Sequence, residues 1–257
     1  MDRESGVMRK SSNSILLGCL LAAAYLAPLA AQASPIQNPV VSMEFTGVAG
    51  PSLNGIYTAP YYANVGPAGL TQDSQFTSQN STAIAIYCDD FYDDVDTGQV
   101  WQATVTNLDQ LSTTQVDTGL MFNDMSPARQ VSDYMAAAWL VEQIAGGNLT
   151  TLQTELDSYA IWRIFDPQAL QGLSGSDDSL VWQDLQDAFT QVQDDTPGDF
   201  SNIDIYTPVD STPGSAGSQE YFAILPQVSA PEPSTLALAA LGLVAVAFAM
   251  RRRRQST

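Results

Sequence analysis

The sequence has no histidine and only two cysteines among its 257 residues. Without histidine, the chain cannot form Ser-His-Asp or Cys-His catalytic sites, and it lacks the commonest ligand of zinc. Cys19 lies in an N-terminal apolar run, so Cys88 is the one cysteine of the remaining chain and has no partner there for a disulfide. Packing must therefore supply the stability of the folded part.

Basic residues are nearly missing from the middle of the chain, residues 34–228. Seven of the nine lysines and arginines lie near the two ends, which leaves Arg129 and Arg163 against 25 acidic residues. The resulting net charge of minus 23 repels nucleic acid and anionic lipid, so neither is expected to bind this part. Its length suffices for one acidic domain with a hydrophobic core.

The N-terminus has the three parts of a secretory signal peptide, predicted at residues 1–33. Three basic residues precede an apolar run at residues 15–29, and Ala31-Gln32-Ala33 then offers a cleavage site for signal peptidase. Leu16-Leu17-Gly18-Cys19 is similar to a lipoprotein signal, but many apolar residues still follow it, which favours ordinary cleavage before Ser34. The domain at residues 34–228 is therefore expected outside the cytoplasm.

The C-terminus, residues 229–257, carries a second three-part signal. An uncharged apolar run at residues 235–250 separates a proline-rich motif, Pro231-Glu232-Pro233-Ser234, from four basic residues, Arg251, Arg252, Arg253 and Arg254. The run is shorter than the usual span of about 20 residues, but flanking arginine side chains can extend it. The arginines are expected to stay in the cytoplasm, which places the domain across the inner membrane.

This order of motif, apolar helix and arginine block resembles the PEP-CTERM sorting tail. The resemblance implies an exported protein of a Gram-negative bacterium, anchored in the inner membrane as an intermediate. It implies that an exosortase-like membrane enzyme recognises Pro231, Glu232 and Pro233. It also implies a final place at the cell surface or in the extracellular matrix, near exopolysaccharide, but it names no activity. An ordinary tail anchor is the alternative.

Hydrophobic patterning predicts strands on both sides of a helical middle. Strands are expected at residues 39–48, 56–58, 82–88, 100–108, 203–206 and 220–225. Residues 60–80 are rich in Gly, Ser, Thr and Gln and are expected to form a loop. Helices are expected from Ser126-Pro127 to Gly146-Gly147, at 152–165 and at 177–193. This order predicts a single α+β domain, with antiparallel strands around a central three-helix segment.

The most acidic segment is Cys88-Asp89-Asp90-Phe91-Tyr92-Asp93-Asp94-Val95-Asp96-Thr97-Gly98, with five carboxylates in eight residues. A divalent cation would relieve their repulsion, so calcium is a candidate cofactor. Its expected ligands are Asp90, Asp93, Asp94 and Asp96. The later glutamate of an EF-hand is missing, because Val105 occupies that position. A solvated acidic hairpin loop without a cofactor is therefore the favoured interpretation, and calcium binding is the alternative.

The segments Tyr87-Cys88, Ala137-Ala138-Trp139-Leu140 and Ala160-Ile161-Trp162 together resemble the thioester domains of bacterial surface adhesins. The resemblance implies a covalent bond between a cysteine thiol and a glutamine side chain, which amines on a target can attack. Cys88 matches the cysteine, but Ser158 stands at the position of the glutamine and cannot supply the acyl carbon. A fold relative without the bond is therefore expected, and a covalent adhesin is the alternative.

Aromatic residues offer a second possible binding surface, because rings pack against sugar faces. Three of the four tryptophans fall on expected helices, where core packing is the favoured interpretation. Tyr57, Tyr61 and Tyr62 are the better candidates for exposed contact.

The sequence thus predicts a non-enzymatic, exported protein with a structural or adhesive role at the surface or in a biofilm matrix. A glycan-active enzyme built on paired carboxylates, Asp89 with Asp90 or Asp94 with Asp96, is the alternative.

Overall fold

The computed structural model describes residues 38–209 and 218–225. The expected signal peptide at 1–33 and the sorting signal at 229–257 lie outside the described residues. Within the described ranges, no helix is both long and apolar enough to span a bilayer.

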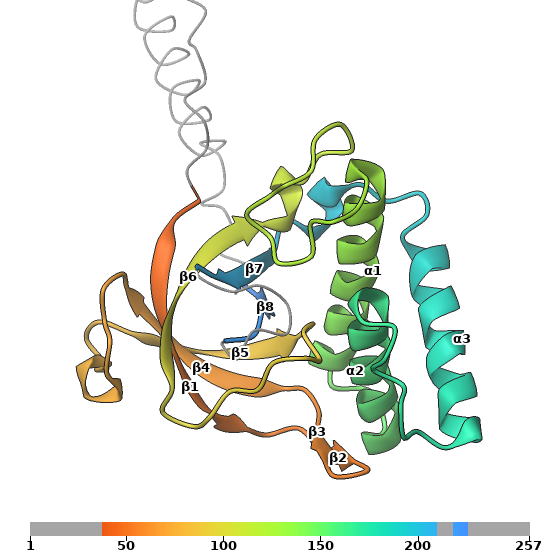
Figure 1. Ribbon diagram of the computed structural model, residues 1–257, viewed down its shortest axis with the longest axis horizontal. Helices are drawn as coiled ribbons and strands as arrows, with labels where there is room; N and C mark the ends of the chain where they lie inside the picture. Colours follow the sequence, from red (N-terminus) through yellow and green to blue (C-terminus); the bar gives the residue numbers. More distant parts are fainter. Residues whose placement is uncertain (1–37, 210–217, 226–257) are drawn as a thin grey trace, which may run out of the picture. The chain divides into compact units, whose positions relative to one another are not determined.

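Six antiparallel strands form a closed barrel (Figure 1). Around the barrel they are β1 (Val40–Val48), β4 (Tyr61–Pro67), β5 (Thr82–Cys88), β8 (Tyr221–Ile224), β7 (Ile203–Pro208) and β6 (Val100–Asn107). Strand β6 pairs with β7 on one side and with β1 on the other, which closes the sheet. Closure leaves these strands without the unpaired edge through which sheets aggregate.

A small hairpin, β2 (Ser52–Leu53) with β3 (Ile56–Tyr57), lies between β1 and β4 in the chain. Asn54 and Gly55 both have positive φ, 53° and 84°, as the tight turn of a two-residue hairpin requires. Gly50 lets the chain cross closely, because a Cβ there would lie 1.9 Å from the carbonyl oxygen of Thr58. These residues fix the position of Tyr57.

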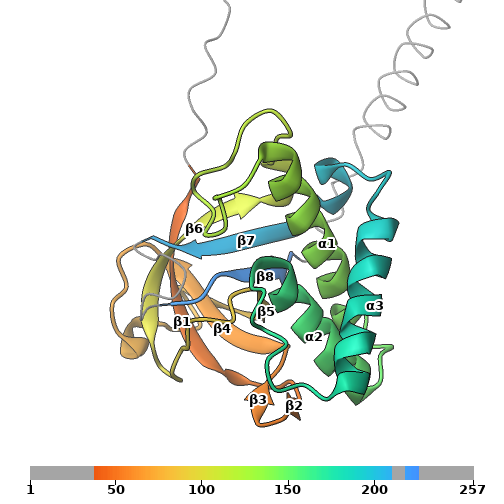
Figure 2. The ribbon, with the colours of Figure 1, turned by 45° about the vertical axis from the view of Figure 1, so that its right-hand side comes forward.

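Three helices pack together on one side of the barrel, with α3 outermost (Figures 1 and 2). They are α1 (Pro127–Ala145), α2 (Thr151–Phe165) and α3 (Gly175–Gln191). Each begins at a hydroxyl N-cap, Ser126, Thr150 or Ser174, whose oxygen accepts a backbone N–H three residues later. Short 3-10 turns occupy Asp73–Gln75, Leu108–Gln110 and Pro197–Phe200.

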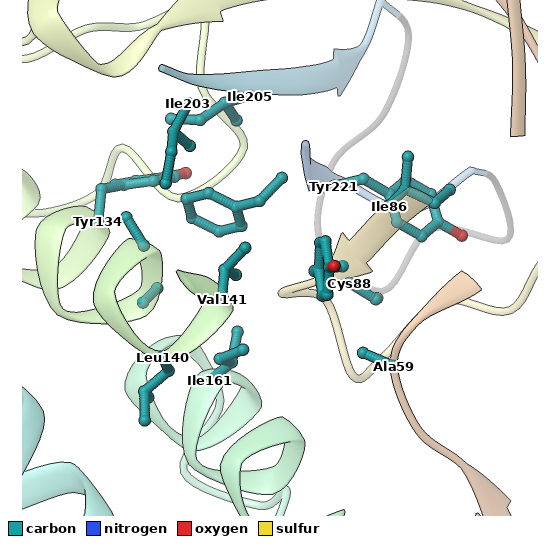
Figure 3. Close-up of a cluster of buried hydrophobic side chains, with 14 of the residues drawn as sticks. Ala59, Ile86, Cys88, Tyr134, Leu140, Val141, Ile161, Ile203, Ile205 and Tyr221 are labelled. Atoms are coloured by element: carbon teal, nitrogen blue, oxygen red, sulfur yellow. The ribbon is translucent and has the colours of Figure 1, made fainter. Parts of the chain in front are cut away.

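The core lies between the barrel and the inner helices. Leu140 and Val141 of α1 and Ile161 of α2 are fully buried, as are Ile203 and Ile205 of β7 (Figure 3). Burying a side chain of this size stabilises the fold by about 1.5–3 kcal/mol. The helices are therefore held to the barrel by an apolar interface.

The predicted α+β class and the antiparallel strands are confirmed, and the three helices begin and end within two residues of the expected bounds. Two expectations were wrong. The strands close on each other and do not surround the helices. The expected loop at 60–80 begins with β4, whose Tyr61 and Ala63 face the core while Tyr62 is exposed. The Gly, Asn and Pro content of β4 hid this alternation.

Candidate functional site

A cavity of about 310 Å³ lies where the β2–β3 hairpin, the acidic loop and α2 meet. We call it the Tyr57 cavity. Five aromatic side chains line it: Phe45, Tyr57, Tyr61, Phe91 and Trp162. Its polar lining comes from four other side chains: Asp90, Asp93, Asp94 and Gln219. The cavity thus combines residues that are up to 174 positions apart in the chain, from Phe45 to Gln219.

The aromatic wall is held by specific contacts. Tyr57 is 62% exposed, and the Tyr61 hydroxyl donates a 2.6 Å hydrogen bond to its carbonyl oxygen. Trp162 is buried on α2, with its ring 5.4 Å from that of Phe91 and 5.0 Å from that of Tyr159. Fixed rings of this kind lose little side-chain entropy when a ligand packs against them.

The acidic loop is also fixed. The backbone N–H of Gly98 donates to the carbonyl oxygen of Phe45 at 2.7 Å, which ties the end of the loop to β1. The side-chain amide of Gln219 donates to the carbonyl oxygens of both Asp90 and Asp93. The loop is thus held by β1 and by Gln219, just before β8, so its carboxylates have defined positions at the cavity.

Asp90 is the most perturbed acid of this site. It is fully buried, and burial raises its pKa to about 7. One carboxylate oxygen accepts the N–H of Tyr92 at 2.9 Å, which opposes the rise, whereas the facing Asp93 adds to it. The other oxygen, Oδ2, receives no hydrogen bond from the described residues. Asp90 therefore holds its proton to a much higher pH than an ordinary aspartate.

The expected calcium ligands are only partly brought together. Asp90, Asp93 and Asp94 line the cavity, while Asp96 is exposed outside it. In the part of the chain that the structure describes, no three or more Asp, Glu, Cys or His side chains are placed to hold a metal ion. Calcium binding stays a prediction.

The sequence comparison assigns the end of the chain. Residues 229–254 match the PEP-CTERM protein-sorting motif. The chain carries a PEP-CTERM sorting signal. This confirms the prediction made from Pro231-Glu232-Pro233-Ser234 and the arginine block. The signal is that of exported proteins sorted by exosortase, which are anchored in the membrane transiently and then released to the cell surface. No curated protein matches the chain.

The sorting signal leaves the domain itself unassigned, and the thioester resemblance is not borne out. Cys88 is 3% exposed, in the same buried cluster as Ala59, Val141 and Tyr221 (Figure 3). Its thiol donates to the carbonyl oxygen of Asp90 at 3.0 Å. Burial, and then the nearby Asp90 and Asp89, raise the pKa of this thiol well above its usual value. A buried, neutral thiol is a poor nucleophile.

Serine at position 158 has a structural role instead. The Ser158 hydroxyl donates to the carbonyl oxygen of Thr154 at 2.8 Å and accepts the N–H of Ala59 at 3.2 Å. It therefore joins α2 to the segment that leads into β4. Gln153, on the same helix, donates to Asp157 and Asp184, so its amide is engaged between α2 and α3.

The aromatic expectations had mixed outcomes. Of the three helical tryptophans, Trp162 is buried as expected and Trp139 is half-buried, but Trp182 is 43% exposed beneath the guanidinium of Arg163, which lies 4.7 Å from the ring centroid. Tyr57 is exposed as expected, whereas Tyr61 is buried. Helical spacing did not reveal that α3 is an outer helix with one face in solvent.

A second hollow, of about 560 Å³, lies between the start of α1 and the end of β7. It is larger, but its ionisable side chains are Asp124 and Arg129 alone, and Arg129 is paired with Asp133 at 3.2 Å. The Tyr57 cavity therefore has the more distinctive chemistry.

Sequence reasoning missed one polar group in the core, the pair Asp89 and Glu220. Both are fully buried. Burial, and then the facing Glu220 carboxylate, raise the pKa of Asp89 well above its usual value. Glu220 accepts hydrogen bonds from Tyr134 at 2.5 Å, from the N–H of Met121 at 2.9 Å and from Thr207. Asp89 is therefore the protonated partner. Nothing in the local sequence links two residues 131 positions apart.

Proposed function

We propose that the exported domain binds polysaccharide non-covalently through the Tyr57 cavity, in a structural or adhesive role at the cell surface or in the matrix. The observation that carries this proposal is the exposed ring of Tyr57 beside the carboxylates of the cavity. Sugar rings have apolar C–H faces and a rim of hydroxyl donors, so they fit an aromatic wall with acceptors next to it. The sorting signal supports it, since proteins with this signal are released to the cell surface.

The burial of the acids supports a binding role over catalysis. A glycan-active enzyme needs two carboxyl groups that reach the scissile bond from opposite sides. Asp89 and Asp90 are both fully buried, so neither reaches a polymer chain directly. Asp94 and Asp96 are exposed loop residues, and only Asp94 lines the cavity. Cleavage of a glycan by either expected pair is therefore not proposed.

A binding experiment with a matched pair of tyrosines tests this proposal. Exopolysaccharide from the producing cells would be titrated against the full chain in detergent, against Tyr57→Ala and against Tyr62→Ala. Both rings are exposed, 62% and 45%, but only Tyr57 lines the cavity. Loss of one aromatic contact is expected to weaken binding roughly twofold to tenfold in Tyr57→Ala.

The control variant distinguishes binding at the Tyr57 cavity from a general effect of losing an exposed tyrosine. Tyr62→Ala is expected to bind as the wild type does. Equal affinity of Tyr57→Ala and wild type, or release of reducing sugar during incubation, would contradict the proposal.

A further inference from the structure

The charged side chains that line the Tyr57 cavity are all acidic. Asp90, Asp93 and Asp94 line it, and no basic residue is among the described residues of its wall. The described domain has only two arginines, Arg129 and Arg163, and neither lines this cavity. The negative potential of three carboxyl groups in a partly enclosed space is weakly screened by water. The cavity therefore disfavours anionic sugars and attracts cations.

Two residues that line the cavity have a buried polar atom with a poor partner. Oδ2 of Asp90 accepts no N–H or O–H from the described residues and faces the Asp93 carboxyl group. The indole N–H of Trp162 faces the weakly accepting sulfur of Cys88. Both atoms are buried, so this polar floor acts on a ligand through its charge and not by direct contact.

The aromatic wall adds a second attraction for a cation. A protonated amine near the face of a tyrosine or tryptophan ring is stabilised by the ring quadrupole, more so where water is excluded. Tyr57 and Trp162 offer such faces next to the carboxylates. The same rings pack against the apolar face of a sugar.

From these features we propose that the ligand of the Tyr57 cavity is an amine-bearing glycan, a polymer of hexosamine with free amino groups. This inference rests on the proposed function, because it names the class of polysaccharide. The protonated amino group meets Asp94 at the rim, while Asp90 and Asp93 attract it from the floor. The apolar face of the sugar ring packs on the exposed ring of Tyr57.

The cavity fits this ligand better than a metal ion or a lysine side chain. The described carboxylates do not form a set of three metal ligands. A lysine side chain brings the positive charge but no flat apolar ring, so it would pack less well on the exposed Tyr57 ring. A hexosamine provides the charge and an apolar ring face on one rigid ring.

The test compares two oligosaccharides that differ only at nitrogen. A fully deacetylated glucosamine tetramer and its fully N-acetylated counterpart would be titrated against the full chain by calorimetry, in the presence of EDTA. The deacetylated tetramer is expected to bind at least tenfold more tightly, because acetylation removes the positive charge.

Two variants remove the same charge from the same loop. Asp94→Asn, at the cavity, is expected to weaken binding of the deacetylated tetramer roughly threefold, and Asp96→Asn, outside it, to leave binding unchanged. Both side chains are exposed, so both variants are expected to fold. Asp90→Asn tests the floor of the cavity in the same way. It is expected to weaken binding of the deacetylated tetramer, in a protein whose thermal unfolding matches that of the wild type.

Several results would overturn the inference. They are equal binding of the two tetramers, equal loss in Asp94→Asn and Asp96→Asn, a requirement for calcium, or equally tight binding of a lysine tetrapeptide. If neither tetramer binds but exopolysaccharide from the producing cells does, in a manner that depends on Tyr57, the amine inference fails and the proposed function stands. If Tyr57→Ala changes no binding at all, the proposed function itself fails.

Discussion

Asp89 and Glu220 place two fully buried carboxyl groups against each other where β5 and β8 meet. Neither oxygen of Asp89 receives a hydrogen bond from an N–H or O–H of the described residues, whereas Glu220 receives three. A single proton held on Asp89 satisfies the pair. Loss of that proton would leave two negative charges in the core, which is strongly unfavourable.

The pair predicts that the domain loses stability as pH rises. The folded pKa values of both acids are raised, by burial in each case, above the value of about 4 in an unfolded chain. Their contribution is therefore fully present below about pH 4 and is lost as pH rises through the folded pKa of Asp89. Urea unfolding across pH should show a decline of up to about 1.4 kcal/mol per pH unit for one proton.

Asp89→Asn isolates this effect. Asparagine stays neutral and can donate to Glu220, so the decline in unfolding free energy at high pH should become shallower. Asp94→Asn removes an exposed acid from the same loop and should follow the wild type. A steep decline that persists unchanged in Asp89→Asn would show that other groups cause it.

Cys88 is predicted to be unreactive in the folded protein. Its thiol is buried and its pKa is raised, so the reactive thiolate is scarce. In the domain at residues 34–228, iodoacetamide should modify Cys88 only after unfolding, and the intact mass of that domain should equal the mass of its sequence. Rapid modification under native conditions, or a mass lower by one ammonia, would revive the thioester that the structure does not support.

Much of the helical layer could be predicted from the sequence, because its signals are local. Ser126-Pro127 marks the start of α1, and the glycines at 146 and 147 mark its end. The third helix was placed two residues late, since Gly175 is a weak helix former and hid the N-cap at Ser174. The helix bounds could be predicted because the capping residues lie next to them in the sequence.

Individual strands of the barrel and individual residues of the site could be predicted, but not how they come together. Closure depends on β6 pairing with both β1 and β7, and no local pattern encodes such a choice of partners. The acidic loop and Tyr57 were recognised as unusual, but Trp162 was expected to be only a core residue. Its place in the cavity wall depends on how α2 packs against the barrel.

The N-cap of α1 gives a direct test of the helical layer. The Ser126 hydroxyl accepts the N–H of Arg129, so Ser126→Ala should lower the unfolding free energy by about 1 kcal/mol. Ser126→Asn should keep most of the stability, because its side chain can cap equally well. Identical urea midpoints for all three proteins would contradict the assigned start of the helix.

Ionisation of Asp90 is predicted to strengthen binding of an amine-bearing glycan as pH rises to about 7. The pKa of Asp90 is about 7, and a cation in the cavity favours its ionised form. Three other groups influence this region: Asp93, Asp89 and the Cys88 thiol, which donates to the carbonyl oxygen of Asp90. The amine of the ligand also titrates, but it does so equally with both proteins. The ratio of the wild-type affinity to that of Asp90→Asn should therefore rise between about pH 5.5 and 7. A constant ratio would exclude Asp90 from the site.

The most direct test of the whole account follows the protein through the cell. Its central claim is that the C-terminal signal, residues 229–254, directs this acidic domain to the outer surface. Mass spectrometry of surface and membrane fractions would compare the wild type with Pro231→Ala/Pro233→Ala. The wild-type domain is expected at the surface, and the double variant is expected to remain in the inner membrane. Full-length wild-type protein in the cytosol, with both ends intact, would contradict the account.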